Sequence, residues 1–248
     1  MIHTFHALML IGLSFMTTSS YATQLSDPFI KLSSVAPDII QSPHYATTQN
    51  FLGKQVPGYH SSELYCTREA ALALKEVNVA LNEKGYALVV YDAYRPQRAV
   101  NAFIDWSKDE TDLVGQAHYY PTLPKSSLFT LGYLAEKSSH SRGSTFDLTL
   151  LPLRQNLKPM TFTVRTLQNG ETIPFLDDNT VDMGSSFDLF HPVSNHNSPL
   201  ITPEQAHMRN LLRHEMKQHR FKELKEEWWH YTLAQEPYPE TYFDVVYK

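Results

Sequence analysis

The chain has 248 residues, a length that fits one sizeable domain or two small ones. Hydrophobic residues make up 42% of it and charged residues 19%, as in soluble globular proteins that bury a core. The formal net charge of -5 argues against nucleic acid or an anionic membrane as partner, because both require a basic face. Cys66 is the only cysteine, which excludes an intramolecular disulfide.

The first 22 residues have the pattern of a secretory signal. They contain no Asp, Glu, Lys or Arg, are mostly apolar from Ala7 to Met16, and end in the small-x-Ala site Ser20-Tyr21-Ala22. The apolar run is too short to cross a bilayer as a helix. We therefore expect cleavage after Ala22, a mature domain of residues 23–248, and a periplasmic location.

The first half of the mature chain begins with a segment punctuated by prolines, residues 23–60, which predicts extended segments and loops. A helix is predicted over residues 67–84, because Thr67 can cap it, apolar residues recur at helical spacing, and Gly85 can end it. A strand rich in Val, Leu and Tyr follows over residues 86–91.

Beyond that strand, Pro96 is predicted to open a second helix. Residues 107–135 are polar and predict irregular structure. Composition favours a strand over residues 146–151, and residues 152–200 carry the turn signals of loops and hairpins, such as Asn169-Gly170.

The last helix is predicted over residues 203–219. Its start, Thr202-Pro203-Glu204-Gln205, combines an N-cap, a proline in the first turn and a capping-box glutamine. Residues 228–233 predict a final strand. No repeat or linker divides the chain, so we predict a single α+β domain with a central, mostly antiparallel sheet flanked by helices.

Three short segments contain the residues best suited to chemistry. Asp147 is a charged residue in mid-strand, and His140, one loop earlier, is a possible second ligand of a divalent metal. Glu227 and His230 enclose two tryptophans, which indicates either a pocket wall or an aromatic core strand. They can meet only if Glu227 lies on the turn into the strand. Arg95, at the end of a strand, is either functional or structural. Each signal alone also fits a structural role.

Together the segments resemble a known family. Residues 91–100, 138–150 and 227–231 are similar to the signature segments of the D-alanyl-D-alanine dipeptidases, the VanX-type enzymes of vancomycin resistance and their chromosomal relatives. These belong to the zinc DD-peptidases, whose fold resembles the hedgehog signalling domain. Further blocks in the same order extend the resemblance over nearly all of the mature chain: Tyr45-Ala46-Thr47, Asn50-Phe51-Leu52-Gly53, Met183 to Asp188, and Glu236 to Asp244.

The resemblance implies one zinc ion per chain, with an open fourth position for water. The implied roles are zinc ligand for His140, Asp147 and His230, general base for Glu227, and oxyanion-stabilising cation for Arg95. For a small dipeptide substrate, Asp188 and Tyr45 are implied to receive the ammonium, and Ser138 to hold the carboxylate.

Two features depart from the family pattern. Residues 153–182 form a longer connection than in the compact resistance enzymes, and this region is expected to border the cleft. The signal is the second departure, because the resistance enzymes are cytoplasmic. An exported enzyme would instead degrade dipeptide released by peptidoglycan turnover.

Two other functions compete with this reading. The nearest is a zinc DD- or LD-carboxypeptidase acting on peptidoglycan stem peptides. The second is a zinc-containing peptidoglycan-binding or signalling module, which would be expected to lack the base or the cation. The sequence leaves oligomerisation open.

Six other histidines and the tryptophans of residues 227–231 are assigned simpler roles. Trp228 is expected in the pocket wall and Trp229 in the core, from strand alternation. Structural or solvated roles are expected for His118, His191, His196, His207, His214 and His219.

Overall fold

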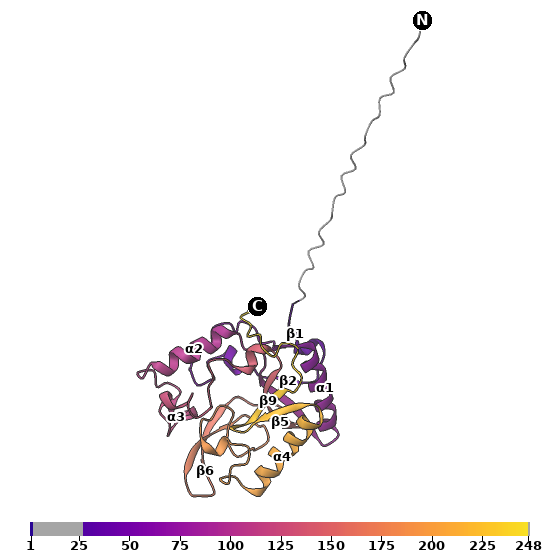
Figure 1. Ribbon diagram of the computed structural model, residues 1–248. Helices are drawn as coiled ribbons and strands as arrows, with labels where there is room; N and C mark the ends of the chain where they lie inside the picture. The colour runs from indigo at the N-terminus through magenta and orange to yellow at the C-terminus, as the bar shows by residue number, and fades with distance from the viewer. Residues whose placement is uncertain (2–26, 248) are drawn as a thin grey trace.

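A five-stranded sheet lies at the centre of the computed structural model, which describes Met1 and residues 27–247 (Figure 1). The outer strand β2 runs parallel to β4, and every other neighbouring pair is antiparallel. The prediction of a mostly antiparallel central sheet is therefore confirmed. In spatial order the strands are β2 (Ile40–Gln41), β4 (Tyr86–Asp92), β5 (Thr145–Pro152), β9 (Glu227–Leu233) and β8 (Phe221–Leu224).

Two smaller sheets flank this one. Strand β1 (Ile30–Lys31) pairs with β3 (Tyr65–Cys66), and β6 (Thr161–Thr166) pairs with β7 (Thr172–Asp177). The second pair is a hairpin at the lower left of Figure 1. Its turn contains Gly170 at a φ of +84°, where glycine carries no steric cost, as the Asn169-Gly170 signal predicts.

The two long helices begin at the caps that the sequence predicts. Helix α1 (Arg68–Asn82) starts after Thr67, whose side chain accepts a hydrogen bond from the Ala70 amide. Helix α4 (Pro203–Gln218) starts with the reciprocal capping box of Thr202 and Gln205. Both helices contact the central sheet and each other, and they cover one of its faces at the right of Figure 1.

Shorter helices and turns complete the domain on the other side. Helix α2 (Gln97–Lys108) begins one residue after Pro96, which lies at the N-cap rather than in the first turn. The remaining pieces are helix α3 (Gln116–Tyr119) and the 3₁₀ turns η1 (Leu32–Ser34), η2 (His44–Ala46), η3 (Lys125–Ser127), η4 (Ser139–Arg142) and η5 (Pro192–Ser194). The α+β domain is thus confirmed.

Some expectations from the sequence need correction. Residues 107–135 are not wholly irregular, because they include α3 and η3. The buried Lys125 organises this region by donating hydrogen bonds to the carbonyls of Trp106 and Asp112, a long-range contact that no local pattern shows. Strand β8 was not predicted. The predicted signal lies outside the described residues, among which no helix combines the length and apolar character needed to span a membrane.

Candidate active site

A row of side chains crosses three neighbouring strands of the central sheet. In the strand register, Asp92 of β4 lies opposite Asp147 of β5, and Asp147 lies opposite His230 of β9. Residues directly opposite each other on antiparallel strands share a face of the sheet. Strand β5 is buried along nearly its whole length, so Asp147 faces protein and not bulk water. The row therefore places acidic and imidazole groups together in a buried setting.

His140 joins this row from the turn η4, which precedes β5. Its Nε2 lies 3.2 Å from Asp147 Oδ2 and 3.3 Å from His230 Nδ1, and His230 Nδ1 lies 3.1 Å from Asp147 Oδ1. A tetrahedral ion with ligand bonds of about 2.0 Å has ligand–ligand edges of about 3.3 Å. The three side chains are therefore spaced as three ligands of one such ion.

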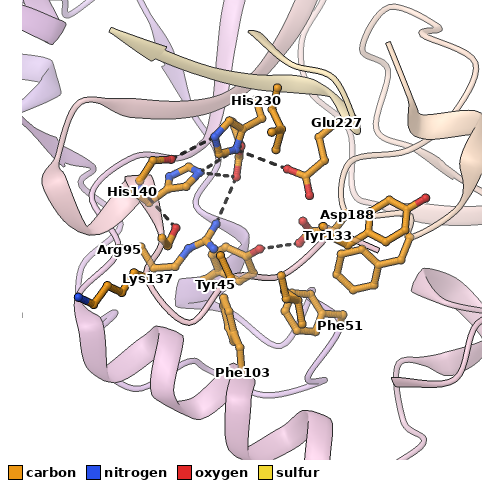
Figure 2. Close-up of a pocket in the computed structure, with 18 of the residues that line it drawn as sticks. Tyr45, Phe51, Arg95, Phe103, Tyr133, Lys137, His140, Asp188, Glu227 and His230 are labelled. Carbon is orange, nitrogen blue, oxygen red and sulfur yellow. Dashed lines mark hydrogen bonds and ion pairs between the residues drawn. The ribbon is translucent and has the colours of Figure 1, made fainter. Parts of the chain in front are cut away.

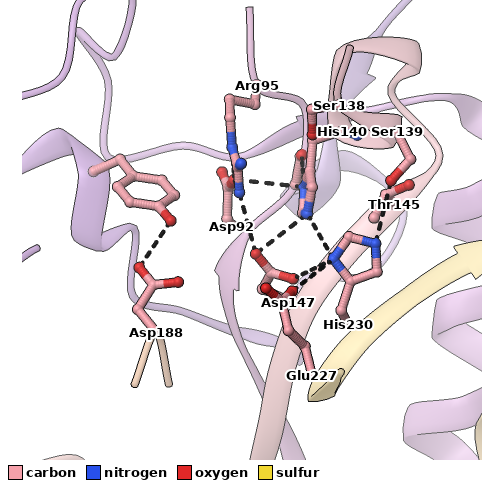
Figure 3. A network of polar contacts seen from close by, with 12 residues as sticks. Asp92, Arg95, Ser138, Ser139, His140, Thr145, Asp147, Asp188, Glu227 and His230 are labelled. Atoms are coloured by element: carbon pink, nitrogen blue, oxygen red, sulfur yellow. Dashed lines mark hydrogen bonds and ion pairs between the residues drawn. The ribbon is translucent and has the colours of Figure 1, made fainter. Parts of the chain in front are cut away.

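In each histidine, the ring nitrogen that points away from the three-ligand centre has a partner of its own, which orients the ring. His140 Nδ1 donates to the Ala93 carbonyl at 2.7 Å, which leaves the Nε2 lone pair available. His230 Nε2 lies 3.2 Å from Ser139 Oγ (Figure 3). Hydrogen bonds of this kind orient metal-binding histidines. Asp147 Oδ1 is buried and accepts no well-aligned hydrogen bond within the described residues. The donor set fits a divalent metal ion.

The carboxylates and imidazoles of this centre shift each other's pKa values. Burial opposes a charge on His230, but the carboxylates of Asp147 and Glu227 outweigh burial and raise the His230 pKa to about 9. Burial likewise opposes the charge of Asp147, but the two imidazoles hold its pKa well below the usual range. The carboxylates therefore favour positive charge at His230, the position that a cation bound between these side chains would share.

Glu227 meets His230 although the two lie three residues apart in one strand. It is the first residue of β9, where the pairing with β8 shifts register, and its Oε2 lies 3.4 Å from His230 Nδ1. This position satisfies the condition set by the sequence, because the irregular strand entry lets both side chains face the same space. Burial raises the Glu227 pKa, and the adjacent His230 counters part of that rise.

Arg95 reaches the same space from the segment between β4 and α2. Its Nε donates to Asp92 Oδ2 at 2.9 Å, and its Nη2 donates to Asp147 Oδ2 at 3.3 Å. Its guanidinium carbon lies 5.0 Å from the ring centre of Tyr45 and 5.1 Å from that of Phe103. The cation is thus held between two carboxylates and two aromatic faces.

Asp188 and Tyr45 form a second polar group across the cavity. The Tyr45 hydroxyl donates to Asp188 Oδ2 at 2.8 Å, and both side chains are buried. Asp188 has a φ of +60°, a left-handed conformation that is uncommon for residues other than glycine. Burial and the nearby charge of Asp147 raise the Asp188 pKa well above its ordinary value.

The segment that carries Asp188 is fixed from α4 and β9. Arg209 donates to the carbonyls of Met183, Val193 and Asn195, and Trp228 Nε1 donates to Ser185 Oγ at 2.9 Å. Strain of this kind persists where the surrounding structure enforces it, and such residues cluster at functional sites. These contacts therefore fix the backbone around Asp188 in the conformation that directs its carboxylate into the cavity.

These groups surround one cavity of about 260 Å³ (Figure 2). All eight residues that the sequence singled out line it: Tyr45, Arg95, Ser138, His140, Asp147, Asp188, Glu227 and His230. Aromatic walls that the sequence did not indicate complete it: Phe51, Phe103, Tyr133 and Phe190. None of the six histidines expected to be structural or solvated lies on this cavity.

Three expectations about the site were incomplete or wrong. Trp228 does not line the cavity, because it is buried against Ser185 and the Arg209 guanidinium. No residue of 153–182 lines the cavity either, because the segment folds as the β6–β7 hairpin away from it. Asp92, which lies within residues 91–100, was not predicted to have a role, although a carboxylate three residues before an arginine at the end of a strand indicates an ion pair.

Comparisons with known proteins agree with this geometry. The sequence model of peptidase family M15, described as D-Ala-D-Ala dipeptidase, matches residues 26–162 and 165–248. A D-alanyl-D-alanine dipeptidase of Enterococcus faecalis is 37% identical over 222 residues, which cover 90% of this chain and 99% of the relative. Proteins of that name from Enterococcus faecium (38% over 204 residues) and Streptomyces coelicolor (37% over 200 residues) cover 82% and 81% of this chain, and 90% and 88% of themselves.

Proposed function

The chain belongs to the M15 family of D-Ala-D-Ala dipeptidases and is a metallopeptidase, and on this premise we propose that it hydrolyses D-alanyl-D-alanine with one zinc ion. One observation carries the proposal. The cavity has a three-ligand metal centre with Glu227 and Arg95 at one end, and the Asp188–Tyr45 pair at the other. At about 260 Å³ it suits a molecule as small as a dipeptide.

His140, Asp147 and His230 would hold the zinc. When bound, zinc supplies Lewis acidity, which makes water nucleophilic near neutral pH and polarises a carbonyl. Glu227 takes the proton of the attacking water and returns it to the leaving amine, a double task that its raised pKa favours. The Arg95 guanidinium donates to the oxyanion that forms at the scissile carbonyl.

The remaining polar groups orient the dipeptide. Asp188 accepts the free ammonium, and the Tyr45 hydroxyl keeps that carboxylate in place. Ser138, which caps the turn carrying His140, holds the substrate carboxylate. A peptide extended at its N-terminus would bury Asp188 without a cation, which costs several kcal/mol. This set of contacts favours a strict dipeptidase over a carboxypeptidase.

A substrate panel tests the function. The mature protein, with its metal content measured, is incubated with D-Ala-D-Ala, L-Ala-L-Ala and a stem pentapeptide that ends in D-Ala-D-Ala. We expect D-alanine release from the first substrate only, and loss of activity on chelation with recovery on adding zinc. Release of D-alanine from the pentapeptide at a comparable rate would instead establish a carboxypeptidase. A zinc-loaded protein inert toward all three would contradict the proposal.

We also propose that the protein is exported to the periplasm, where it degrades dipeptide released by peptidoglycan turnover. The support is the sequence of residues 1–22 alone. Expression of the full chain with a C-terminal tag should give a periplasmic protein whose N-terminal residue is Thr23. A cytoplasmic protein that retains residues 1–22 would refute export and leave the catalytic proposal intact.

A further inference from the structure

We propose that Asp92 is a positioning residue, which holds the Arg95 guanidinium in place and restrains it from pairing fully with Asp147. The inference rests on the function proposed above, because it assigns Asp92 a role toward the same metal centre. Asp92 does not line the cavity, so it acts through its neighbours and not on the substrate.

Asp92 is a fully buried carboxylate with both oxygens in use. Its Oδ2 lies 2.9 Å from both Nε and Nη2 of Arg95, and its Oδ1 accepts from the Tyr59 hydroxyl at 2.7 Å. Charge-assisted hydrogen bonds of this kind are the strong ones in proteins. Asp92 is therefore anchored on one side by Tyr59, and on the other it fixes the arginine.

An irregularity of strand β4 aims Asp92 at this position. Val90 lies opposite Leu148, but Asp92 lies opposite Asp147, so two steps along β4 match one step along β5. In a regular ladder Asp92 would lie opposite Phe146, on the face that carries Leu148. The extra residue, Tyr91, turns Asp92 to the face that carries Asp147. Bulges often re-aim a side chain beside an active site in this way.

Two carboxylates thus compete for one cation (Figure 3). Arg95 Nη2 lies 2.9 Å from Asp92 Oδ2 and 3.3 Å from Asp147 Oδ2, so the closer contact is with Asp92. The rings of Tyr45 and Phe103 flank the guanidinium and limit its other directions. Without the charge of Asp92, the arginine would turn to Asp147, the remaining carboxylate with which it forms an ion pair among the described residues.

Such a turn would weaken the metal centre, because Asp147 supplies its negative charge. Asp147 Oδ2 also lies 3.2 Å from His140 Nε2, so it is already shared between the imidazole and the arginine. Asp92 Oδ2 lies 3.4 Å from His140 Nδ1, but that nitrogen donates to the Ala93 carbonyl at 2.7 Å, so Asp92 acts on the centre chiefly through Arg95. Outer partners of this kind orient metal ligands, and losing them typically costs 10- to 100-fold in affinity or activity.

The test is a double-mutant cycle with Asp92→Asn, Arg95→Ala and the double variant. The first readout is the affinity for Co²⁺, followed by its visible spectrum in competition with a chelator, which does not depend on turnover. We expect Asp92→Asn to weaken Co²⁺ binding about 10- to 100-fold when Arg95 is present, and less than about threefold in the Arg95→Ala background. The second readout is steady-state kinetics, where Asp92→Asn should lower kcat about 10- to 100-fold with little change in KM, because Arg95 acts in the transition state.

A matched control is the ion pair of Asp244 with Arg98, which lies in the first turn of helix α2, three residues after Arg95. Asp244 accepts two hydrogen bonds of 2.9 Å from Arg98, but this pair is half-exposed and distant from the cavity lining. Asp244→Asn should leave metal affinity and kcat within about twofold, because exposed ion pairs contribute little.

Three outcomes would overturn the inference. Equal weakening of Co²⁺ binding by Asp92→Asn in both backgrounds would make its role independent of Arg95, and no weakening in either would remove the role. If Asp92→Asn does not fold, the Co²⁺ affinity of the Arg95→Gln variant tests the inference instead. This variant keeps Asp92, and its Co²⁺ affinity should equal or exceed that of the wild type. A tenfold weaker affinity would contradict the proposal that Asp92 restrains Arg95 from pairing with Asp147. A wild-type protein that binds Co²⁺ but cleaves no dipeptide would refute the proposed function, while the affinity cycle still decides the role of Asp92.

Discussion

Replacing Glu227 with glutamine is expected to lower kcat for D-Ala-D-Ala by about 10²- to 10⁴-fold while the protein keeps its metal. General acid–base catalysis contributes rate factors of this size, and a loss of 10³ corresponds to about 4 kcal/mol of transition-state stabilisation. Glutamine preserves the size of the side chain beside His230 but cannot take a proton. The measurement is kcat with metal content determined on the same sample.

The pH profile sharpens this test. A base must be deprotonated, and burial raises the Glu227 pKa, so wild-type activity should fall with decreasing pH through a value above the ordinary glutamate pKa. That acid limb should be absent from the residual activity of Glu227→Gln. Glu226→Gln is the matched control, because Glu226 is adjacent in sequence and does not line the cavity. Near-wild-type kcat in metal-loaded Glu227→Gln would refute the assigned base.

Replacing Asp188 with asparagine is expected to lower kcat/KM for D-Ala-D-Ala by about 10²- to 10³-fold. Truncating or neutralising one partner of a buried, hydrogen-bonded charge pair costs roughly 2–5 kcal/mol. Asparagine is the appropriate substitution because, like aspartate, it tolerates the left-handed backbone found at this position, so the change removes charge without adding strain.

Selectivity distinguishes this role from a structural one. Wild-type enzyme should prefer D-Ala-D-Ala strongly over N-acetyl-D-Ala-D-Ala, which lacks only the ammonium, and Asp188→Asn should narrow that preference at least tenfold. Tyr45→Phe removes the hydroxyl that holds Asp188 but keeps its charge, so it should have a smaller effect. An Asp188→Asn variant that loses activity equally toward both substrates would contradict an ammonium-binding role.

Local signals in the sequence were sufficient for the main elements of the fold. Thr67 and the Thr202–Gln205 box predicted the starts of α1 and α4 because capping is a contact between residues three apart. Strand β8 and the turn around Lys125 were not predictable in this way. Their stability depends on partners far along the chain, such as β9 and the carbonyls at the end of α2.

The residues of the site were predicted through the family resemblance, whereas the geometry that unites them could not be. Asp147 and His230 meet because of the β5–β9 register, and Asp92 faces them because of one extra residue in β4. Neither the register nor the bulge has a local sequence pattern. The same limit explains the error at Trp228, where simple strand alternation took no account of the irregular entry to β9.

The row of side chains across β4, β5 and β9 also has a consequence for the order of folding. His140 and His230 are separated by 90 positions, so they come together only after β5 and β9 have paired. Before that step the chain offers an ion no more than two nearby ligands and little affinity. An ion that binds only the completed row stabilises the native state by mass action. Such an ion would bind after the folding transition state, so it would slow unfolding and have little effect on the folding rate.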